Sequence, residues 1–237
     1  MNNTPLAVPN TPLAKLEQEI IACRACPRLV AWREEVASTK RRAYREWDYW
    51  GKPVPGWGDP SARLLLVGLA PGAHGANRTG RPFTGDGSGT FLYAALFRAG
   101  FASQPTSDTR EDGLQLLDCY MTSVGRCVPP QNRLKAQEIA NCRPFLEAEI
   151  AMLPQVKVVL CLGRVAFDGY LRALREMGHD LARLNFGHGI HHRLGRQLPH
   201  LLASYHPSLH NTNTGRLTAS MMDDVLARAK ELFGSPS

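Results

Sequence analysis

Arg63-Leu64-Leu65-Leu66-Val67-Gly68-Leu69 is a nearly unbroken apolar run in a sequence that otherwise mixes polar and apolar residues. A short run rich in Leu and Val is the pattern of a strand that is buried on both faces of a parallel sheet. A Gly-rich loop and then an amphipathic stretch over residues 89–99 follow this run. Because strand, loop and helix in this order form the repeating unit of an α/β protein, the stretch decides the fold class.

The same order recurs along the rest of the chain. Strand patterns and helical patterns alternate at residues 116–124 (strand), from 135 onward (helix), 156–162 (strand), 164–177 (helix), 201–204 (strand) and 217–233 (helix). This alternation predicts a three-layer α/β/α sandwich with a central, mostly parallel sheet. There is no internal repeat and no sharp change of composition, so the sequence predicts a single domain over residues 13–234.

The two ends of the chain have a different composition. Three prolines and few apolar residues in positions 1–12 predict a disordered N-terminal lead-in, and residues 235–237 are expected to fray. Two helices are expected next, at about residues 13–22 and 29–36.

Pro144 interrupts a helical pattern. A proline inside a helix removes a hydrogen bond and clashes with the preceding turn, whereas the first helical position tolerates it. We therefore expect Pro144 to begin a new helix, with Cys142 at the helix entrance.

Composition limits the classes of function. The chain has 237 residues, 43% of them hydrophobic and 21% charged, as in an ordinary globular protein. Lys and Arg number 28 against 21 Asp and Glu, a net charge of +7 that favours a polyanionic partner such as nucleic acid. Neither a signal peptide nor a membrane-spanning run is recognisable, so we expect a cytoplasmic, nucleoid-associated protein with no membrane partner.

Six cysteines in a cytoplasmic protein are more consistent with buried thiols or metal ligands than with disulfides. Cys119 and Cys161 lie inside strand patterns and are expected to be core thiols. The other four lie at the edges of expected elements, namely Cys23, Cys26, Cys127 and Cys142. From the residues alone, four thiolates suit a 4Fe-4S cluster or a structural zinc ion equally well. Four unligated thiols are a third possibility.

Three loops are candidates for a functional site. In open α/β sheets the site lies beyond the carboxyl ends of the strands, which here are residues 71–88, 125–134 and 205–218. The first loop is dense in glycine, so its backbone can approach a ligand closely and point N–H groups at anions. Two Arg, one Phe and one Asp stand among these glycines, which favours a functional loop over a flexible linker.

The three loops also carry a family resemblance. Residues 68–89 include Gly68-Leu69-Ala70-Pro71-Gly72, residues 122–133 include Pro-Pro-Gln-Asn, and residues 204–218 include His-Pro-Ser. In order and spacing, and together with the four cysteines, these motifs resemble the family 5 (type B) branch of the iron-sulfur uracil-DNA glycosylases from residue 23 to about residue 218.

The resemblance implies a uracil-DNA glycosylase-like α/β/α domain with a structural 4Fe-4S cluster held by the four edge cysteines. It also implies an enzyme that hydrolyses the N-glycosidic bond of a deaminated base in double- or single-stranded DNA, as the first step of base excision repair. Such an enzyme must flip the base out of the duplex. We expect Gly72, Ala73, Phe83 and Ser123 to line the base pocket, with the Phe83 ring as the stacking platform. The alternative for Phe83 is a core position behind Pro82.

Catalytic roles follow from the same resemblance. It matches His206 to the residue that donates a hydrogen bond to the leaving base, with a purely structural histidine as the alternative. It matches Asp86 to a carboxylate that orients water or stabilises the sugar cation, and Asn132 to a second water-positioning residue. Asp86 could instead cap the helix that follows it. In the related family 4 enzymes an acidic residue follows the first glycine of the motif, and here Leu69 stands at that position.

Ser123 is a second departure from the relatives. The uracil-selective relatives resemble this chain but have Asn after the strand-end Thr, and a serine hydroxyl cannot make the paired contact of an amide. We therefore expect a broad specificity that includes hypoxanthine, xanthine and 5-substituted uracils.

Contacts with DNA are expected from the loop cations and from an apolar wedge at the point where the base leaves the stack. The candidate residues are Arg78, Arg81, Arg133, Leu209, His210 and Arg216. Residues 40–50 mix cations with aromatic residues, so they could add backbone contacts or could form a solvated face. The run His188, His191 and His192 is expected to be a solvated turn rather than a zinc site.

No lysine stands in the three loops, so lyase chemistry through a nucleophilic amine is not expected. The protein is expected to act as a monomer. A different class of function also fits: a non-catalytic iron-sulfur or zinc module that binds damaged or single-stranded DNA.

Overall fold

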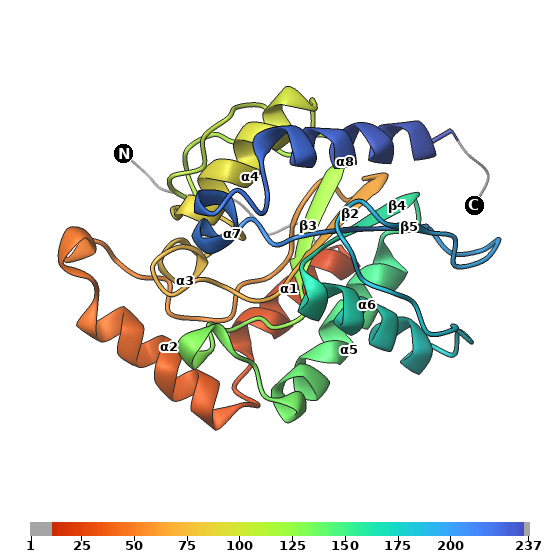
Figure 1. Cartoon of the computed structure of the whole chain (residues 1–237). Helices are drawn as coiled ribbons and strands as arrows, with labels where there is room; N and C mark the ends of the chain where they lie inside the picture. Colours follow the sequence, from red (N-terminus) through yellow and green to blue (C-terminus); the bar gives the residue numbers. More distant parts are fainter. Residues whose placement is uncertain (1–10, 235–237) are drawn as a thin grey trace.

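The structure is a computed structural model that describes residues 11–234 as a six-stranded sheet between two groups of helices (Figure 1). The sheet order is β1-β3-β2-β4-β6-β5. The strands are β1 (Trp57–Gly58), β2 (Leu64–Gly68), β3 (Cys119–Ser123), β4 (Val158–Leu162), β5 (His191–His192) and β6 (His200–Ser204). The predicted α/β/α sandwich is confirmed.

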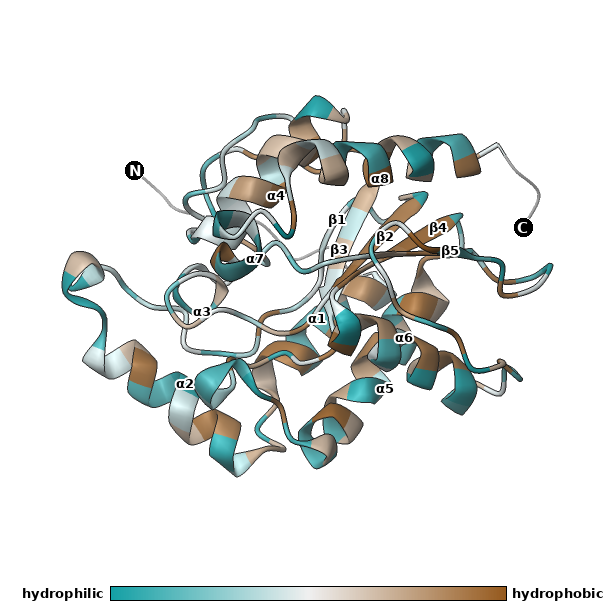
Figure 2. Cartoon of the chain, viewed as in Figure 1, coloured by the Kyte–Doolittle hydropathy of each residue, from teal (hydrophilic) through white to brown (hydrophobic). Residues whose placement is uncertain are grey.

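The four central strands, β3, β2, β4 and β6, are parallel to one another. The two edge strands, β1 and β5, are only two residues long and pair antiparallel with β3 and β6. The quoted apolar run forms β2, and all five of its residues are buried between two neighbouring strands. Figure 2 shows the hydrophobic residues concentrated along the sheet.

Helices cover both faces of the sheet. In Figure 1, α4 and α8 lie on one side of the sheet, and α5 and α6 lie on the other; α1 packs against α5. The helices are α1 (Pro12–Ala22), α2 (Pro27–Thr39), α3 (Ala76–Thr79), α4 (Gly87–Arg98), α5 (Ala136–Met152), α6 (Arg164–Glu176), α7 (Leu209–Asn213) and α8 (Ala219–Leu232), with short 3-10 turns η1 (Arg42–Tyr44) and η2 (Pro130–Asn132).

Alternation of side chains along the strands divides the core into two layers. Leu64 and Leu66 of β2 pack in the layer under α4 and α8. Leu65 and Val67 of the same strand pack in the layer against α6. A strand that contributes side chains to both core layers must be apolar at every position, and β2 therefore has no polar face.

Pro144 is the clearest departure from the predicted elements. It lies inside α5 instead of beginning a helix, and Cys142 is therefore buried within the helix rather than at its entrance. Proline in a helix interior costs about 3 kcal/mol. Because α5 packs along both α1 and α6, tertiary contacts hold the helix together across the proline.

The start of the chain was also predicted incorrectly in part. The predicted lead-in and the predicted C-terminal tail lie mostly outside the described residues. Thr11, however, caps α1 through its side chain, and Pro12 is the first residue of that helix.

Across residues 11–234, no helix has the length and apolar character needed to span a membrane.

Candidate functional site

The predicted site loops follow the carboxyl ends of three of the four central parallel strands, β2, β3 and β6. Gly68 at the end of β2 is in register with Ser123 at the end of β3. His206 follows β6, two residues after Ser204, and its Cβ lies close to Gly163 at the end of β4. Parallel pairing therefore brings residues that are far apart in the sequence to one edge of the sheet.

Phe83 and His206 face each other at this edge. Their ring centroids are 5.9 Å apart, with the planes tilted by 33°. Phe83 has a positive φ of 51°, which a bulky residue adopts only when its surroundings enforce it. The ring also lies against Gly68, where an added Cβ would be 3.0 Å from Cε2 of Phe83. Phe83 is half-buried, with one side packed on the core.

The electrostatic environment of His206 keeps its imidazole uncharged. Burial lowers the pKa of His206 to about 4. The side-chain amide of Asn211 donates to the His206 carbonyl oxygen at 2.8 Å and so fixes the backbone of the loop. At neutral pH the ring is neutral and has one N–H to donate.

Asp86 is the N-cap of α4, which was one of the two roles that the sequence predicted for it. Its Oδ1 accepts from the backbone N–H of Gly89 at 3.0 Å. Its Oδ2 lies against the Gly-rich loop, since a Cβ added at Gly72 would be 2.7 Å from this atom. Burial raises the pKa of Asp86, while backbone N–H groups and the positive charge of Arg78 oppose that rise.

Leu209 belongs to the short helix α7, which lies over the start of α4. A Cβ added at Gly87 would be 2.5 Å from Cδ2 of Leu209, so the two loops touch here. Leu209 is nevertheless 56% exposed, which is unusual for a large apolar side chain. Its neighbour His210 is exposed as well.

The loop after β3 begins at this edge, where the Val124 N–H donates to the Gly68 carbonyl at 3.0 Å, and then leads away from it. The Ser123 hydroxyl donates to the Gly125 carbonyl at 2.9 Å and so closes its own turn. Asn132 and Arg133 are exposed at the far end of the loop, and Asn132 has a positive φ of 56°. The structure thus brings Phe83, His206, Asp86, Leu209 and the Gly-rich loop together, while Asn132 stands on a separate exposed turn.

The predicted role of Arg81 as a phosphate contact is wrong. Arg81 is 2% exposed, and its guanidinium forms two hydrogen bonds with the Asp112 carboxylate, at 2.9 and 2.6 Å. It also donates to Thr84 and to Ser107, each at 2.9 Å. With the Arg110 carbonyl at 3.3 Å, five acceptor atoms enclose this guanidinium, so it anchors the Gly-rich loop from within and has no access to DNA.

Arg78 needs the same correction. Its side chain is 3% exposed and lies against the rings of both Tyr44 and Trp47, with 4.0 Å from Cζ to each ring centroid. It donates to the carbonyl oxygens of His74 at 2.7 Å and Gly85 at 2.8 Å. Arg78 therefore closes the Gly-rich loop from inside instead of contacting phosphate.

Arg216 keeps an outward position. It is exposed, and its guanidinium lies over the Tyr205 ring at 4.7 Å from the centroid. Because this stacking leaves the donors of the guanidinium accessible, its predicted contact with phosphate stays a prediction. The same holds for the exposed Arg133.

Of the three histidines expected in a solvated turn, His188 does lie in a turn, where it is half-buried, whereas His191 and His192 belong to the sheet edge. His191 and His192 form β5, and His191 Nε2 lies 3.0 Å from Nδ1 of the buried His200. His188 lies 3.2 Å from the Ser204 hydroxyl, and burial lowers its pKa. A two-residue strand has too little periodicity to be recognised in a sequence.

Cys119 and Cys161 are fully buried core thiols, as predicted. The remaining four cysteines lie together where α1, α2, α5 and the loop after β3 meet. Cys26 packs with Cys127 and Leu29 in one small buried cluster. Burial, with smaller contributions from the neighbouring Cys142 and Cys23, raises the pKa of Cys127 to about 11, although Arg33 opposes the rise. The contributions of the two thiols reflect how close they are.

Polar groups point at these thiols. Arg33 Nη1 donates to Cys127 Sγ at 3.0 Å, and the side-chain amide of Asn141 donates to Cys26 Sγ at 3.4 Å. Arg33 is 2% exposed, and its Nε has no hydrogen-bond partner among the described residues. Within residues 11–234, no three His, Cys, Asp or Glu side chains are arranged to hold a single metal ion.

Sequence reasoning missed a buried polar network that joins the end of β3 to α5. Glu149 and Arg126, each 1% exposed, form an ion pair at 2.6 Å. The hydroxyl of Thr122, next to Ser123, donates to the same carboxylate. The one available signal was Arg126 inside the second motif, but its partner lies 23 residues further on, inside a helix.

Comparisons with known proteins agree with the geometry. Residues 55–230 match the family described as the uracil DNA glycosylase superfamily. A type-5 uracil-DNA glycosylase of Thermus thermophilus is 52% identical over 92% of this chain and 96% of its own length. Relatives of the same description from Mycobacterium bovis and Pyrobaculum aerophilum are 48% and 43% identical, over 94% and 89% of this chain and 82% and 88% of their own lengths.

Proposed function

This chain belongs to the uracil DNA glycosylase superfamily, and from that membership we propose that it removes uracil from DNA as the first step of base excision repair. It hydrolyses the N-glycosidic bond of an extruded nucleotide and leaves an abasic site. The observation that carries the proposal is the meeting of Phe83, His206 and Asp86 at the carboxyl edge of the sheet. Its relatives of the same description support the assignment to uracil.

Binding of the base comes first, because the glycosidic carbon is unreachable inside a duplex. The flipped base stacks on the Phe83 ring, opposite the imidazole of His206, and the backbone of Gly72 and Ala73 approaches its edge. Stacking on an aromatic ring is worth about 1 to 3 kcal/mol per base. The enforced positive φ of Phe83 supports this role, since the ring is held in place before the base arrives.

His206 stabilises the departing base. As the bond breaks, negative charge builds up on the base, and a neutral imidazole donates one hydrogen bond to it. A preorganised donor of this kind is typically worth about 2.7 to 4 kcal/mol. The low pKa of His206 supports a hydrogen-bond donor rather than a cation in the ground state.

Asp86 acts on the sugar side of the bond. Because one carboxylate oxygen caps α4, the other is held rigidly against Gly72 and can orient water or stabilise the positive charge on the sugar. Asn132 is the second residue that we propose to position water. Since it is exposed on η2, this role requires the loop after β3 to approach the site when DNA binds.

Ser123 controls which bases the enzyme releases. Its hydroxyl is already engaged with Gly125, which leaves no paired donor and acceptor to select the uracil edge. We propose that hypoxanthine, xanthine and 5-substituted uracils are also released.

DNA is gripped through exposed residues around the site. Arg133 and Arg216 contact phosphates, and Leu209 or His210 enters the space that the flipped base leaves. The exposure of Leu209 directly above the start of α4 supports the wedge role. The absence of lysine from the three site loops supports a hydrolase without lyase activity.

We further propose that Cys23, Cys26, Cys127 and Cys142 hold a 4Fe-4S cluster. The donor set fits, because four unpaired thiols lie close together and the N–H groups of Arg33 and Asn141 point at sulfur. These four cysteines would hold the cluster through their thiolates. The cluster would supply a structural link between α2, α5 and the loop after β3.

The test of function is a time course of free-base release from a uracil-containing duplex. The wild type is compared with Asp86→Asn and His206→Ala, and we expect losses of at least tenfold in both variants. Full activity of Asp86→Asn would remove Asp86 from the mechanism. No release by the wild type would favour the binding module without catalysis.

The cluster has a separate readout. Purified protein should be brown and contain iron and sulfide, and Cys142→Ser should lose the colour. A colourless protein that contains zinc would overturn the cluster assignment without affecting the glycosylase assignment.

A further inference from the structure

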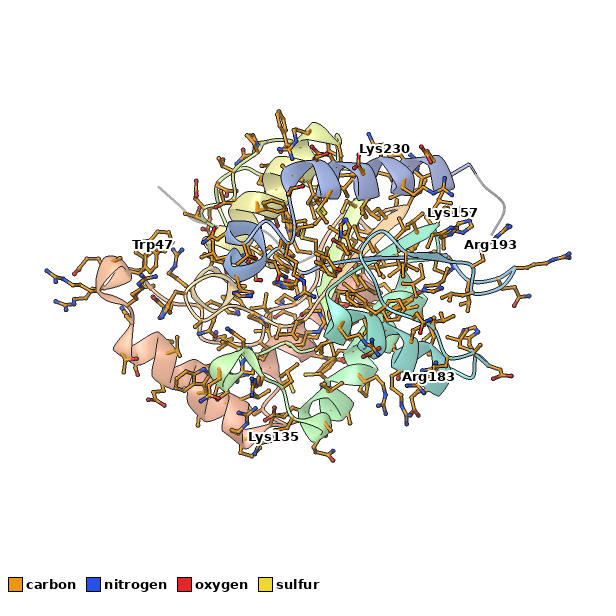
Figure 3. The ribbon with its side chains drawn as sticks, in the orientation of Figure 1. Trp47, Lys135, Lys157, Arg183, Arg193 and Lys230 are labelled. Atoms are coloured by element: carbon orange, nitrogen blue, oxygen red, sulfur yellow. The ribbon has the colours of Figure 1, made fainter. Side chains whose placement is uncertain are left out.

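A basic arm projects from the body of the molecule next to the candidate site. We use this name for residues 40–48, which follow α2 and include η1. The arm carries four cations against two acids, and Arg41, Arg42 and Arg45 are exposed. In Figure 1 it is the orange segment that extends beyond α2, and Figure 3 shows Trp47 on the side of the molecule away from Arg193. None of the roles proposed above uses this segment.

The arm is fastened to the Gly-rich loop by a stack of three side chains. The Arg78 guanidinium contacts both Tyr44 and Trp47 of the arm, at 4.0 Å from each ring, and the two rings meet edge to face at 6.0 Å. Cation–π contacts strengthen when the guanidinium is withdrawn from water, as Arg78 is here. Because Arg78 also binds the carbonyls of His74 and Gly85, the stack connects the arm to the residue directly before Asp86.

Backbone contacts reinforce this connection. The N–H groups of Trp50 and Gly51 donate to the carbonyls of Arg78 and Asn77, at 2.9 and 3.0 Å. The Tyr49 hydroxyl lies 3.1 Å from His74 Nδ1. The arm and the Gly-rich loop therefore form one connected unit.

Charge on the arm reaches the loop. His74 lies close enough to Arg41 for that cation, after burial, to contribute to the lowered pKa of His74. Exposed Arg41 thus lies near the Gly-rich loop, and Arg42 and Arg45, also exposed, follow it in the arm. Arginine forks match the geometry of phosphate oxygens, and a protein that grips duplex DNA needs several of them along its path.

We propose that Arg41, Arg42 and Arg45 bind the phosphate backbone of the duplex that flanks the extruded nucleotide, and that the stack of Tyr44, Arg78 and Trp47 fixes this grip relative to Asp86. This inference rests on the proposed action on DNA. Arg78 acts in it as a positioning residue, and the arginines of the arm are the ones that contact DNA. The arm holds the flanking duplex while the Gly-rich loop receives the base.

The experiment compares two double variants that each remove two exposed cations. Arg42→Ala/Arg45→Ala changes the arm, and Arg183→Ala/Arg193→Ala is the matched control on the other side of the molecule (Figure 3). Binding to an undamaged duplex is measured as a function of salt, so that no base release is needed for the readout. Each lost phosphate contact should lower the slope of log K against log salt by about 0.9.

We expect the arm variant to lower this slope by about 1 to 2 and the control to leave it within about 0.3 of wild type. Equal slopes in both variants would overturn the proposal. If wild type releases uracil while the two slopes stay equal, only the arm fails. If wild type neither binds duplex nor releases uracil, the proposed function fails with it.

The stack has its own test. Trp47→Ala removes one of the two rings that contact Arg78. We expect weaker duplex binding and a smaller slope of log K against log salt, although no charge has been removed. Trp47→Phe keeps an aromatic face and should restore both quantities to near wild type. A wild-type slope in Trp47→Ala would show that the stack does not position the arginines, and would overturn that half of the proposal.

Discussion

Replacing Gly72 by Ala should damage catalysis mainly by displacing the Asp86 carboxylate. The added Cβ would be 2.7 Å from Oδ2 of Asp86, and the next nearest heavy atom is 3.9 Å away. Ordinary contacts of a Cβ begin at 3.4 Å, so the carboxylate oxygen must retreat by about 0.7 Å. A misplacement of about 1 Å can cost on the order of a hundredfold in rate, so we expect a loss of about ten- to a hundredfold.

Single-turnover base release at saturating enzyme measures this loss without interference from product release. The control is a double-mutant cycle with Asp86→Ser, which keeps a side-chain cap for α4 but removes Oδ2. In the Asp86→Ser background, Gly72→Ala should cost less than twofold. An undiminished rate in Gly72→Ala, or the same loss in both backgrounds, would refute the reasoning that the loop and the carboxylate are fitted to each other.

Three further predictions follow from the same geometry. Since the pKa of His206 falls to about 4 on folding, the unfolded chain binds more protons than the folded one between about pH 6.5 and 4; stability should drop as the pH falls through this window, and denaturation midpoints should show a shallower drop in His206→Gln. Arg81→Ala should lower the free energy of unfolding by about 1.5 to 3 kcal/mol, because it removes charge-assisted hydrogen bonds to Asp112, which keeps only its backbone donors; thermal denaturation measures this loss, and a value below about 0.5 kcal/mol would contradict the buried anchor. Ser123→Asn should raise the ratio of uracil to hypoxanthine release by at least tenfold, as competition assays on matched duplexes would measure; an unchanged ratio would remove Ser123 from selectivity.

The central strands and the site edge could be predicted because their signals are local. Residues 64–68 are apolar at every position, and a strand with that pattern has to be buried on both faces. The position of His206 follows from the same logic, because it comes directly after another such strand. Parallel strands end at a common edge, so loops from distant parts of the sequence were expected to meet there.

The errors concern residues whose partners lie far away in the sequence. Arg81 is paired with Asp112, and Arg78 is stacked on Tyr44 and Trp47, so neither arginine could be recognised as buried from its own surroundings. Pro144 shows the same limit in the backbone, since packing of α5 outweighs a local penalty. In a loop rich in glycine, a cation was expected to face a ligand, whereas here two cations supply the rigidity that the glycines lack.

The two short edge strands have a consequence for association between copies of the chain. An unpaired edge of a sheet is a template for a strand from another molecule, and long exposed edges lead to aggregation. Here the four parallel strands end on both sides in an antiparallel strand of only two residues, β1 and β5. Each edge therefore offers a second molecule too few backbone groups to begin a ladder of hydrogen bonds. The site can thus be open to a long polymer while the sheet does not pair with the sheet of another copy.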